Sequence, residues 1–238
     1  MLAPILGTFL VVQQAPCAPE AMRVLSEASV HASRFNLPAA VDSLRAAASC
    51  ESAIVAAWYL QGLLDARAAA NAGGTAESLA PVKKAIAVLE QLARNGSAPP
   101  EIARLILHAA AAAAQTERDE MRLYLESASQ LELVQEAAGL AGAPIVSAAE
   151  MTAALWLQVD RYEEARRAYE EAERRHGATP RIAFGAARAS AGLGDTSSAC
   201  AGYRRLLDSW VSNDMEPPEI VEAHAHSARP ECRPPTVP

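Results

Sequence analysis

The stretch LWLQVDRYEEARRAYEEAERRHGATPRIAFGAARASAGLGDTSSACAGYRRLL, residues 155–207, carries one pattern twice. Two sets of residues, 34 positions apart, share the intervals 3, 4 and 3, which place each set on one face of a helix. The sets are Tyr162, Ala165, Tyr169 and Ala172, then Thr196, Ala199, Tyr203 and Leu206. Each set follows a turn that is itself preceded by a short apolar helix. The repeating unit is therefore helix, turn, helix.

A unit of this length and pattern resembles the tetratricopeptide repeat. Trp58 and Gly62 also match the Trp-x-x-x-Gly signature of that repeat's first helix. The same 3, 4, 3 spacing recurs upstream at Leu37, Ala40, Leu44 and Ala47, at Val82, Ala85, Leu89 and Leu92, and at Met121, Tyr124, Ala128 and Leu131. The resemblance implies an all-α fold, a right-handed α-solenoid of about five helix-turn-helix repeats closed by a C-terminal capping helix. A plain helical bundle is the alternative.

Glycine and proline divide the chain into these repeats. We expect the helical repeat domain to occupy residues 17–227, with the clearest repeats at 146–179 and 180–213. Earlier helices are expected at 20–34, 53–71, 101–116 and 119–138, and a final helix from Pro217 to Ser227 caps the array. Residues 228–238 are expected to form an irregular, proline-rich tail.

Composition and charge favour a helical protein and argue against nucleic-acid binding. The chain is 51% hydrophobic but only 5% aromatic, and alanine supplies much of the apolar content, which favours closely packed helices. The net charge is −7, and the arginine pairs alternate with carboxylates at the i,i+4 spacing of exposed helix pairs. No basic cluster is available to neutralise phosphates, so we expect no nucleic-acid partner.

The N-terminus resembles a secretory signal peptide over residues 1–16. Residues 2–15 carry no charge and are mostly apolar from Ile5 to Val12, a run too short to cross a bilayer. No basic residue precedes the run, and Gln13 is a poor residue three positions before a cleavage site, so a buried N-terminal segment is the alternative. We expect an exported protein, periplasmic or extracellular, which would be cytoplasmic if this segment is no signal.

Four cysteines support export independently. Two antiparallel helices would bring Cys17 close to Cys50 at one end of the chain, and Cys200 close to Cys232 at the other. Each disulfide would close a loop of about 33 residues and stabilise the fold by about 3–4 kcal/mol. Such bonds persist outside the reducing cytoplasm. Four buried thiols are the alternative.

The sequence contains no motif that indicates catalysis. Phosphate loops, zinc-protease helices and nucleophile elbows are absent from it. His224, His226 and Cys232 offer metal-ligand chemistry, but a His-x-His pair on a helix points its rings to different faces, and a Cys200–Cys232 bond would remove the third ligand. We therefore expect no enzyme, no cofactor and no metal.

The resemblance implies a concave groove that is lined by the first helix of each repeat and receives a peptide or a partner helix. The positions that would face it are Tyr59, Leu63, Arg67, Glu150, Leu157, Gln158, Arg181, Phe184 and Arg188. Aromatic and arginine side chains are typical interface anchors. The sequence thus favours a non-enzymatic protein-protein interaction scaffold or adaptor. Ordinary solvent-facing helix surface is the alternative at these positions. Alternative functions are a self-assembling envelope structural protein, or a metal-binding regulator or enzyme.

Overall fold

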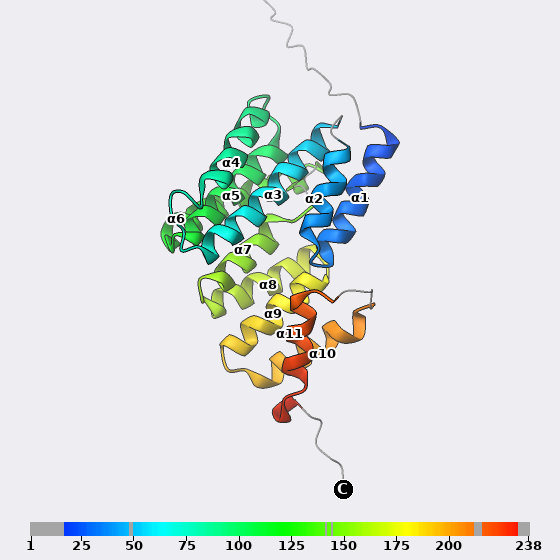
Figure 1. The fold of residues 1–238 in the computed structure, drawn as a ribbon, viewed down its shortest axis with the longest axis vertical. Coiled ribbons are helices and arrows are strands. Elements are labelled where there is room, and N and C mark those ends of the chain that lie inside the picture. Colours follow the sequence, from blue (N-terminus) through cyan, green and yellow to red (C-terminus); the bar gives the residue numbers. More distant parts are fainter. Residues whose placement is uncertain (1–16, 48–49, 141, 144, 212–215, 233–238) are drawn as a thin grey trace, which may run out of the picture.

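The structure, a computed structural model, describes residues 17–47, 50–140, 142–143, 145–211 and 216–232. In these residues it is all-helical, with eleven α-helices, one short 3-10 helix and no strand (Figure 1). The α-helices are α1 (Pro19–Ser33), α2 (Leu37–Ala46), α3 (Glu51–Asn71), α4 (Ala80–Ala93), α5 (Ala98–Ala114), α6 (Arg118–Ala137), α7 (Ala148–Gln158), α8 (Tyr162–His176), α9 (Pro180–Gly192), α10 (Thr196–Ser209) and α11 (Pro218–Ser227). The 3-10 helix η1 spans Pro230–Cys232, within the tail that was expected to be irregular.

Eight of the eleven described α-helices begin with a capping side chain or a proline. Asn36, Ser147, Thr179 and Asp195 precede α2, α7, α9 and α10, and each side chain accepts a hydrogen bond from the backbone N–H three residues later. These caps satisfy N–H groups that have no partner inside the helix. Proline occupies the first or second position of α1, α2, α4, α5, α9 and α11, where its missing N–H costs nothing.

The first helix of every hairpin ends in the same way. The second residue after the helix has a positive φ. The backbone N–H of the next residue donates a hydrogen bond of 2.9–3.0 Å to the carbonyl oxygen five residues earlier. This is the hydrogen bond of a Schellman cap. The positive-φ residues that end α1, α3, α5, α7 and α9 are Phe35, Gly73, Thr116, Asp160 and Gly194. Five hairpins thus share one local structure, although only two of these residues are glycine.

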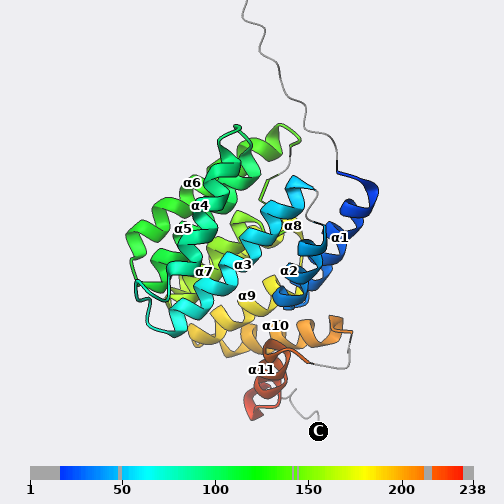
Figure 2. The ribbon, with the colours of Figure 1, turned by 45° about the horizontal axis from the view of Figure 1, so that its top comes forward.

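Helices pack mainly against their neighbours along the chain. Each α-helix contacts the next up to α10, which contacts both α11 and η1. The first helices of the hairpins also contact one another, since α1 packs on α3, α3 on α5, α5 on α7 and α7 on α9. Figures 1 and 2 show that the turn between α1 and α2 nevertheless comes close to α9, where Phe35 contacts Phe184.

Small residues bring the helices close together. Five of the six alanines at 109–114 are buried at 7% exposure or less, so this low-complexity run packs as expected. Gly185 on α9 lies directly against the ring of Tyr169 on α8, where a Cβ would overlap the ring. The last three residues of each repeated set are buried as well, with Ala165, Ala172, Ala199 and Leu206 at 0% exposure, whereas the first residues, Tyr162 and Thr196, are partly buried and exposed.

Two disulfides join the expected cysteines, Cys17 to Cys50 and Cys200 to Cys232. Their Cα atoms lie 5.4 and 5.3 Å apart, within the usual range for disulfides. The predicted pairing is confirmed, and it fits an oxidising compartment. The expected signal segment, residues 1–16, lies outside the described residues. None of the described helices combines the length and the hydropathy needed to cross a membrane.

Candidate functional site

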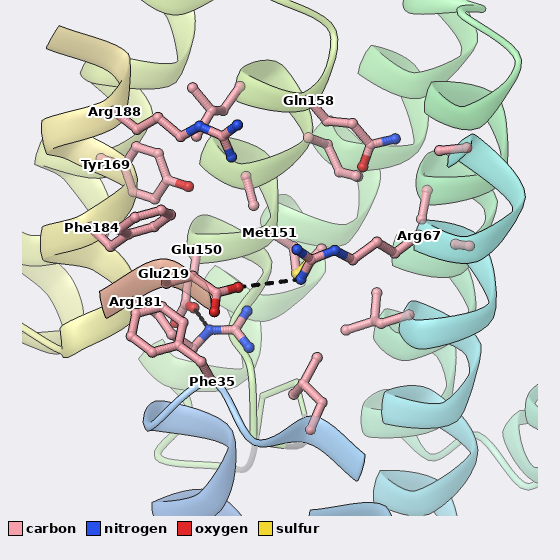
Figure 3. A pocket seen from close by; sticks show the side chains of 18 of the residues that line it. Phe35, Arg67, Glu150, Met151, Gln158, Tyr169, Arg181, Phe184, Arg188 and Glu219 are labelled. Atoms are coloured by element: carbon pink, nitrogen blue, oxygen red, sulfur yellow. Dashed lines mark hydrogen bonds and ion pairs between the residues drawn. The ribbon is translucent and has the colours of Figure 1, made fainter. Parts of the chain in front are cut away.

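A cavity of about 490 Å³ lies along the first helices of the hairpins. Its walls come from α3, α5, α7 and α9, with further side chains from the α1–α2 turn, α8 and α11 (Figure 3). The volume falls within the usual range of ligand pockets, about 300–1,000 Å³. Eight of the nine positions expected in a groove line it: Leu63, Arg67, Glu150, Leu157, Gln158, Arg181, Phe184 and Arg188.

Tyr59 is the exception among the three expected positions of α3, since Leu63 and Arg67 line the cavity and Tyr59 does not. Its side chain is 0% exposed, and its hydroxyl donates a 3.0 Å hydrogen bond to the carbonyl oxygen of Val146. Burial, and then the nearby charge of Glu132, raise the pKa of this phenol well above its usual value. Tyr59 therefore anchors α3 to the segment before α7 instead of facing the cavity.

A nearly buried ion pair forms one wall of the cavity. The Arg181 Nε donates to Glu150 Oε1 at 2.5 Å, and the two side chains are only 16% and 11% exposed. The ring of Tyr169 lies in the same region, and burial followed by the charge of Glu150 raises the pKa of its phenol. In the wall between α7 and α9, the charges of Glu150 and Arg181 therefore compensate each other.

Two carboxylates of the capping helix α11 face arginines of the groove. Glu219 Oε1 lies 3.4 Å from Arg67 Nη1, and Figure 3 shows Arg67 reaching from α3 toward it. Glu222 Oε1 lies 3.4 Å from Arg188 Nε and also accepts a 3.1 Å hydrogen bond from the hydroxyl of Tyr203. The side chains of Arg67 and Arg188 remain 67% and 54% exposed, so solvent or a ligand can reach both.

Phe35 closes one side of the cavity. Its ring centroid lies 5.6 Å from that of Phe184, in an edge-to-face arrangement, and 6.1 Å from that of Trp210. Phe184 is consequently only 7% exposed, so the expected anchor of the groove is already packed against the first hairpin. The sequence gives no local signal of this contact, because Phe35 and Phe184 are far apart in the chain. Phe35 also has a φ of 62°, an uncommon conformation for a bulky residue that only the structure reveals.

The other side of the cavity ends at the α7–α8 turn. Asp160 Oδ1 accepts a 2.8 Å hydrogen bond from the hydroxyl of Tyr162, and this bond raises the pKa of that phenol. Gln158 is exposed beside them and is free to present its amide to a ligand. Amide, carboxylate and guanidinium groups therefore surround a partly apolar space.

The lining offers binding chemistry of a particular kind. Among the described residues that line the cavity there is no histidine, cysteine, serine, threonine or lysine. Arginines, acidic residues and aromatic rings supply its polar and stacking groups.

Comparison of the chain with family models, with curated proteins and with solved structures found no match.

Histidines lie elsewhere in the described part of the chain. The side chain of His224 is 57% exposed and that of His226 is buried, so the two rings do point to different faces of α11. Burial, followed by the charge of Arg229, lowers the pKa of His226. His108 stacks on Tyr124 with ring centroids 4.7 Å apart, outside the cavity.

Proposed function

We propose that this protein is a non-enzymatic scaffold of tetratricopeptide-like repeats, stacked as a right-handed solenoid, that captures a segment of a partner protein in its cavity. Two structural regularities support the repeat architecture. Five hairpins share the same helix-ending hydrogen bond, and their first helices contact one another in series. Arrays of this kind bury a continuous core only when neighbouring repeats stack.

One observation carries the binding proposal. Eight positions chosen on α3, α7 and α9 by repeat register alone gather around a single cavity. Two of them, Arg67 and Arg188, keep at least half of their side chains exposed beside apolar and aromatic surface. Arginine beside aromatic rings is typical of interaction hot spots.

The size of the cavity favours an extended segment over a helix. A helix with its side chains is at least about 10 Å across, so a volume of roughly 500 Å³ would hold only about one turn of it. The turn at Phe35 and the Arg67–Glu219 pair also narrow the space. We therefore favour a short extended peptide or a chain end as the occupant.

Export to a periplasmic or extracellular compartment belongs to the same proposal. Disulfides close both ends of the described helical region, and they are stable where glutathione and thioredoxin do not keep thiols reduced. The apolar segment within residues 1–16 supplies a signal-like pattern for export.

Site-specific photo-crosslinking tests the proposed cavity. A photoreactive amino acid replaces Gln158 in the cavity or, as a matched control, Glu170, which is also exposed, on α8, but lies outside the cavity. We expect a partner captured at position 158 in the native compartment and not at 170. Equal capture at both positions would contradict a cavity-directed interaction.

The affinity of the captured partner then provides the quantitative test. Arg67→Ala combined with Arg188→Ala is expected to weaken binding at least tenfold, whereas Glu170→Ala should leave the affinity unchanged. Both arginines are exposed, so this variant avoids the folding defect expected for the buried Phe184. If only self-crosslinks form and the mass rises with protein concentration, the adaptor proposal gives way to self-assembly.

A further inference from the structure

Three metal-ligating side chains meet at the C-terminal end of the described chain, away from the cavity. Cys200 lies in α10, His226 in the last turn of α11, and Cys232 at the end of η1. One ligand atom from each residue lies within 4.8 Å of the other two. All three residues are buried, at 4%, 8% and 2% exposure. The cluster is therefore assembled by tertiary packing of three separate elements.

The buried ring of His226 has a nitrogen that no described residue pairs with. Its Nε2 atom is buried and has no hydrogen-bond partner among the described residues. The ring packs against Tyr203, with centroids 4.6 Å apart. The large majority of buried side-chain polar atoms in proteins are hydrogen-bonded, so an unpaired one needs an explanation, such as a bound water or ion. A metal ion bound at this ring would provide one.

The other disulfide, between Cys17 and Cys50, is not part of such a cluster in the described chain. Cys17 and Cys50 form the corresponding link at the first hairpin, but they belong to no group of three metal-ligating residues in the described part of the chain. The two disulfides therefore differ in one chemical respect, the presence of a buried histidine. They provide a comparison within a single molecule.

We propose that Cys200, His226 and Cys232 bind a zinc ion when their disulfide is reduced. Two thiolates and one imidazole form a known zinc ligand set, with a fourth position left for water or another ligand. Zinc lies about 2.3 Å from sulfur and about 2.0–2.1 Å from nitrogen, which puts tetrahedral ligand atoms roughly 3.6–3.8 Å apart. The cluster, at 4.8 Å or less, needs to contract by about 1 Å between histidine and sulfur, and the two sulfurs, about 2.0 Å apart while bonded, need to separate to about 3.8 Å once the disulfide is broken.

The conversion between the two states balances chemically. A dithiol reductant supplies two electrons and two protons, the sulfur–sulfur bond breaks, and the reductant leaves as its own disulfide. The two thiols then release their protons as they bind Zn²⁺. Disulfide and metal exclude each other, because both need the same sulfur atoms. Either one holds η1 against α10, so the end of the chain stays closed in both redox states.

Metal titration of the full chain in both redox states tests the site. The protein is reduced with a phosphine, freed of the reductant under nitrogen and titrated with Co²⁺, followed by Zn²⁺ competition against a chromogenic chelator. We expect one equivalent of metal and a thiolate-to-cobalt absorption band for the reduced protein, and no binding for the oxidised protein. Cys17→Ser with Cys50→Ser should keep the full signal. Cys200→Ser with Cys232→Ser should abolish it, although this variant retains two thiols.

Histidine variants in the Cys17→Ser, Cys50→Ser background separate the site from adventitious thiolate binding. His226→Ala and His226→Gln are expected to weaken Zn²⁺ binding at least tenfold, while His224→Ala, two residues away and exposed, leaves it unchanged. Zinc should also raise the melting temperature of the reduced background protein, because it binds the folded state.

Three outcomes would overturn the proposal. They are equal Zn²⁺ affinity of the His226 and His224 variants, metal binding by reduced Cys200→Ser, Cys232→Ser protein, or no binding by a reduced chain whose circular dichroism is still helical. None of them bears on partner capture in the cavity, so the two proposals fail independently.

Discussion

Glu132 is a buried carboxylate that connects three parts of the fold. It is 2% exposed, accepts hydrogen bonds from the backbone N–H groups of Ala148 and Ala143 at 3.0 and 3.2 Å, and lies 3.5 Å from Arg175 Nη2. Because Glu132, on α6, accepts from Ala148, the first residue of α7, it also places a negative charge at the positive end of α7. Glu132 thereby fixes α6 to the start of α7 and to α8.

Removing this carboxylate should destabilise the protein strongly. Glu132→Ala leaves two partly buried or buried N–H groups without an acceptor, so we expect a loss of about 2–3 kcal/mol in the free energy of unfolding. Glu136→Ala, on the same helix and 38% exposed, removes the other acceptor of Arg175 and should cost less than about 1 kcal/mol. Urea unfolding of both variants measures the difference. Equal losses would show that the backbone bonds to Glu132 contribute little.

His108 makes the stability depend on pH. Burial, followed by the charge of Arg104, lowers the pKa of this imidazole, while Glu120, Glu101 and Glu90 act weakly in the opposite direction. The unfolded chain, with a histidine pKa of about 6.5, therefore binds the proton first as the pH falls. Stability is complete above about pH 6.5 and declines from there through the lower pKa of the folded state.

The test compares the melting temperatures of the wild type and His108→Phe, a variant that keeps a ring against Tyr124. Between pH 7.5 and 5 the melting temperature of the wild type should fall further than that of the variant, and above pH 7.5 the gap between them should stay constant. His226, whose pKa is lowered in the same direction, is present in both proteins and cancels in the comparison. Parallel curves at all pH values would contradict this assignment.

The caps that end the first helices can be tested by exchanging residue types. Thr116 holds a φ of 62°, a left-handed conformation that costs a β-branched residue about 1–2 kcal/mol relative to glycine. Gly194 has the equivalent position after α9, with a φ of 75° and open space around its Cα. Thr116→Gly should stabilise the protein by about 0.5–1 kcal/mol, and Gly194→Thr should destabilise it by about 1–2 kcal/mol.

Thermal unfolding of the two cap variants, alone and together, provides the measurement. A gain of that size raises the melting temperature of a chain of 238 residues by roughly 1–4 °C. Thr116→Ala keeps the strained conformation and is the matched control, so it should bring no comparable gain. If Thr116→Gly lowered the melting temperature, the hydroxyl contact of Thr116 with the Gln115 carbonyl oxygen would outweigh the backbone strain.

At the scale of elements, periodicity predicted more than composition. The 3, 4, 3 spacing identified the second helices, and glycine and proline identified the breaks. The five helices whose bounds were predicted, α1, α3, α5, α6 and α11, lie within about three residues of those bounds, as expected of strongly periodic segments. Tyr59 was wrongly expected in the groove because α3 buries nine residues on several faces, which leaves no single polar face to orient it. Contacts such as Phe35 on Phe184 and Glu219 on Arg67 were missed because they join helices that are distant in the sequence.

The contact between the first hairpin and α9 makes the whole molecule more closed than an open array. Phe35→Ala removes the ring that packs on Phe184 and Trp210, and we expect it to destabilise the protein by about 1–3 kcal/mol. It should also widen the cavity, which hydrogen exchange can report as faster exchange of amides in α9 and α11. Met22→Ala, at an apolar position of α1 that is 57% exposed, is the control and should change neither. Unchanged exchange in α9 would mean that the ring contact does not close the cavity.

The same closure predicts that the two disulfides are energetically coupled. Each encloses a loop of 32–33 residues, so removing either pair by Cys→Ser substitution should cost about 3–4 kcal/mol in the chain-entropy model. In an open array, changes at opposite ends would simply add, because distant sites share no partners. Here the α1–α2 turn packs on α9 and Trp210, so loosening one end also weakens the surface that the other end contacts.

We therefore expect the double removal to cost less than the sum of the two single removals, by at least about 0.5 kcal/mol. The free energy of unfolding is measured for all four proteins under oxidising conditions, so that every remaining disulfide stays formed. Repeating the cycle with Phe35→Ala should bring the coupling to zero, because that ring carries the contact between the ends. Strict additivity in the presence of Phe35 would show that the ends unfold independently and that the cavity is open at that side.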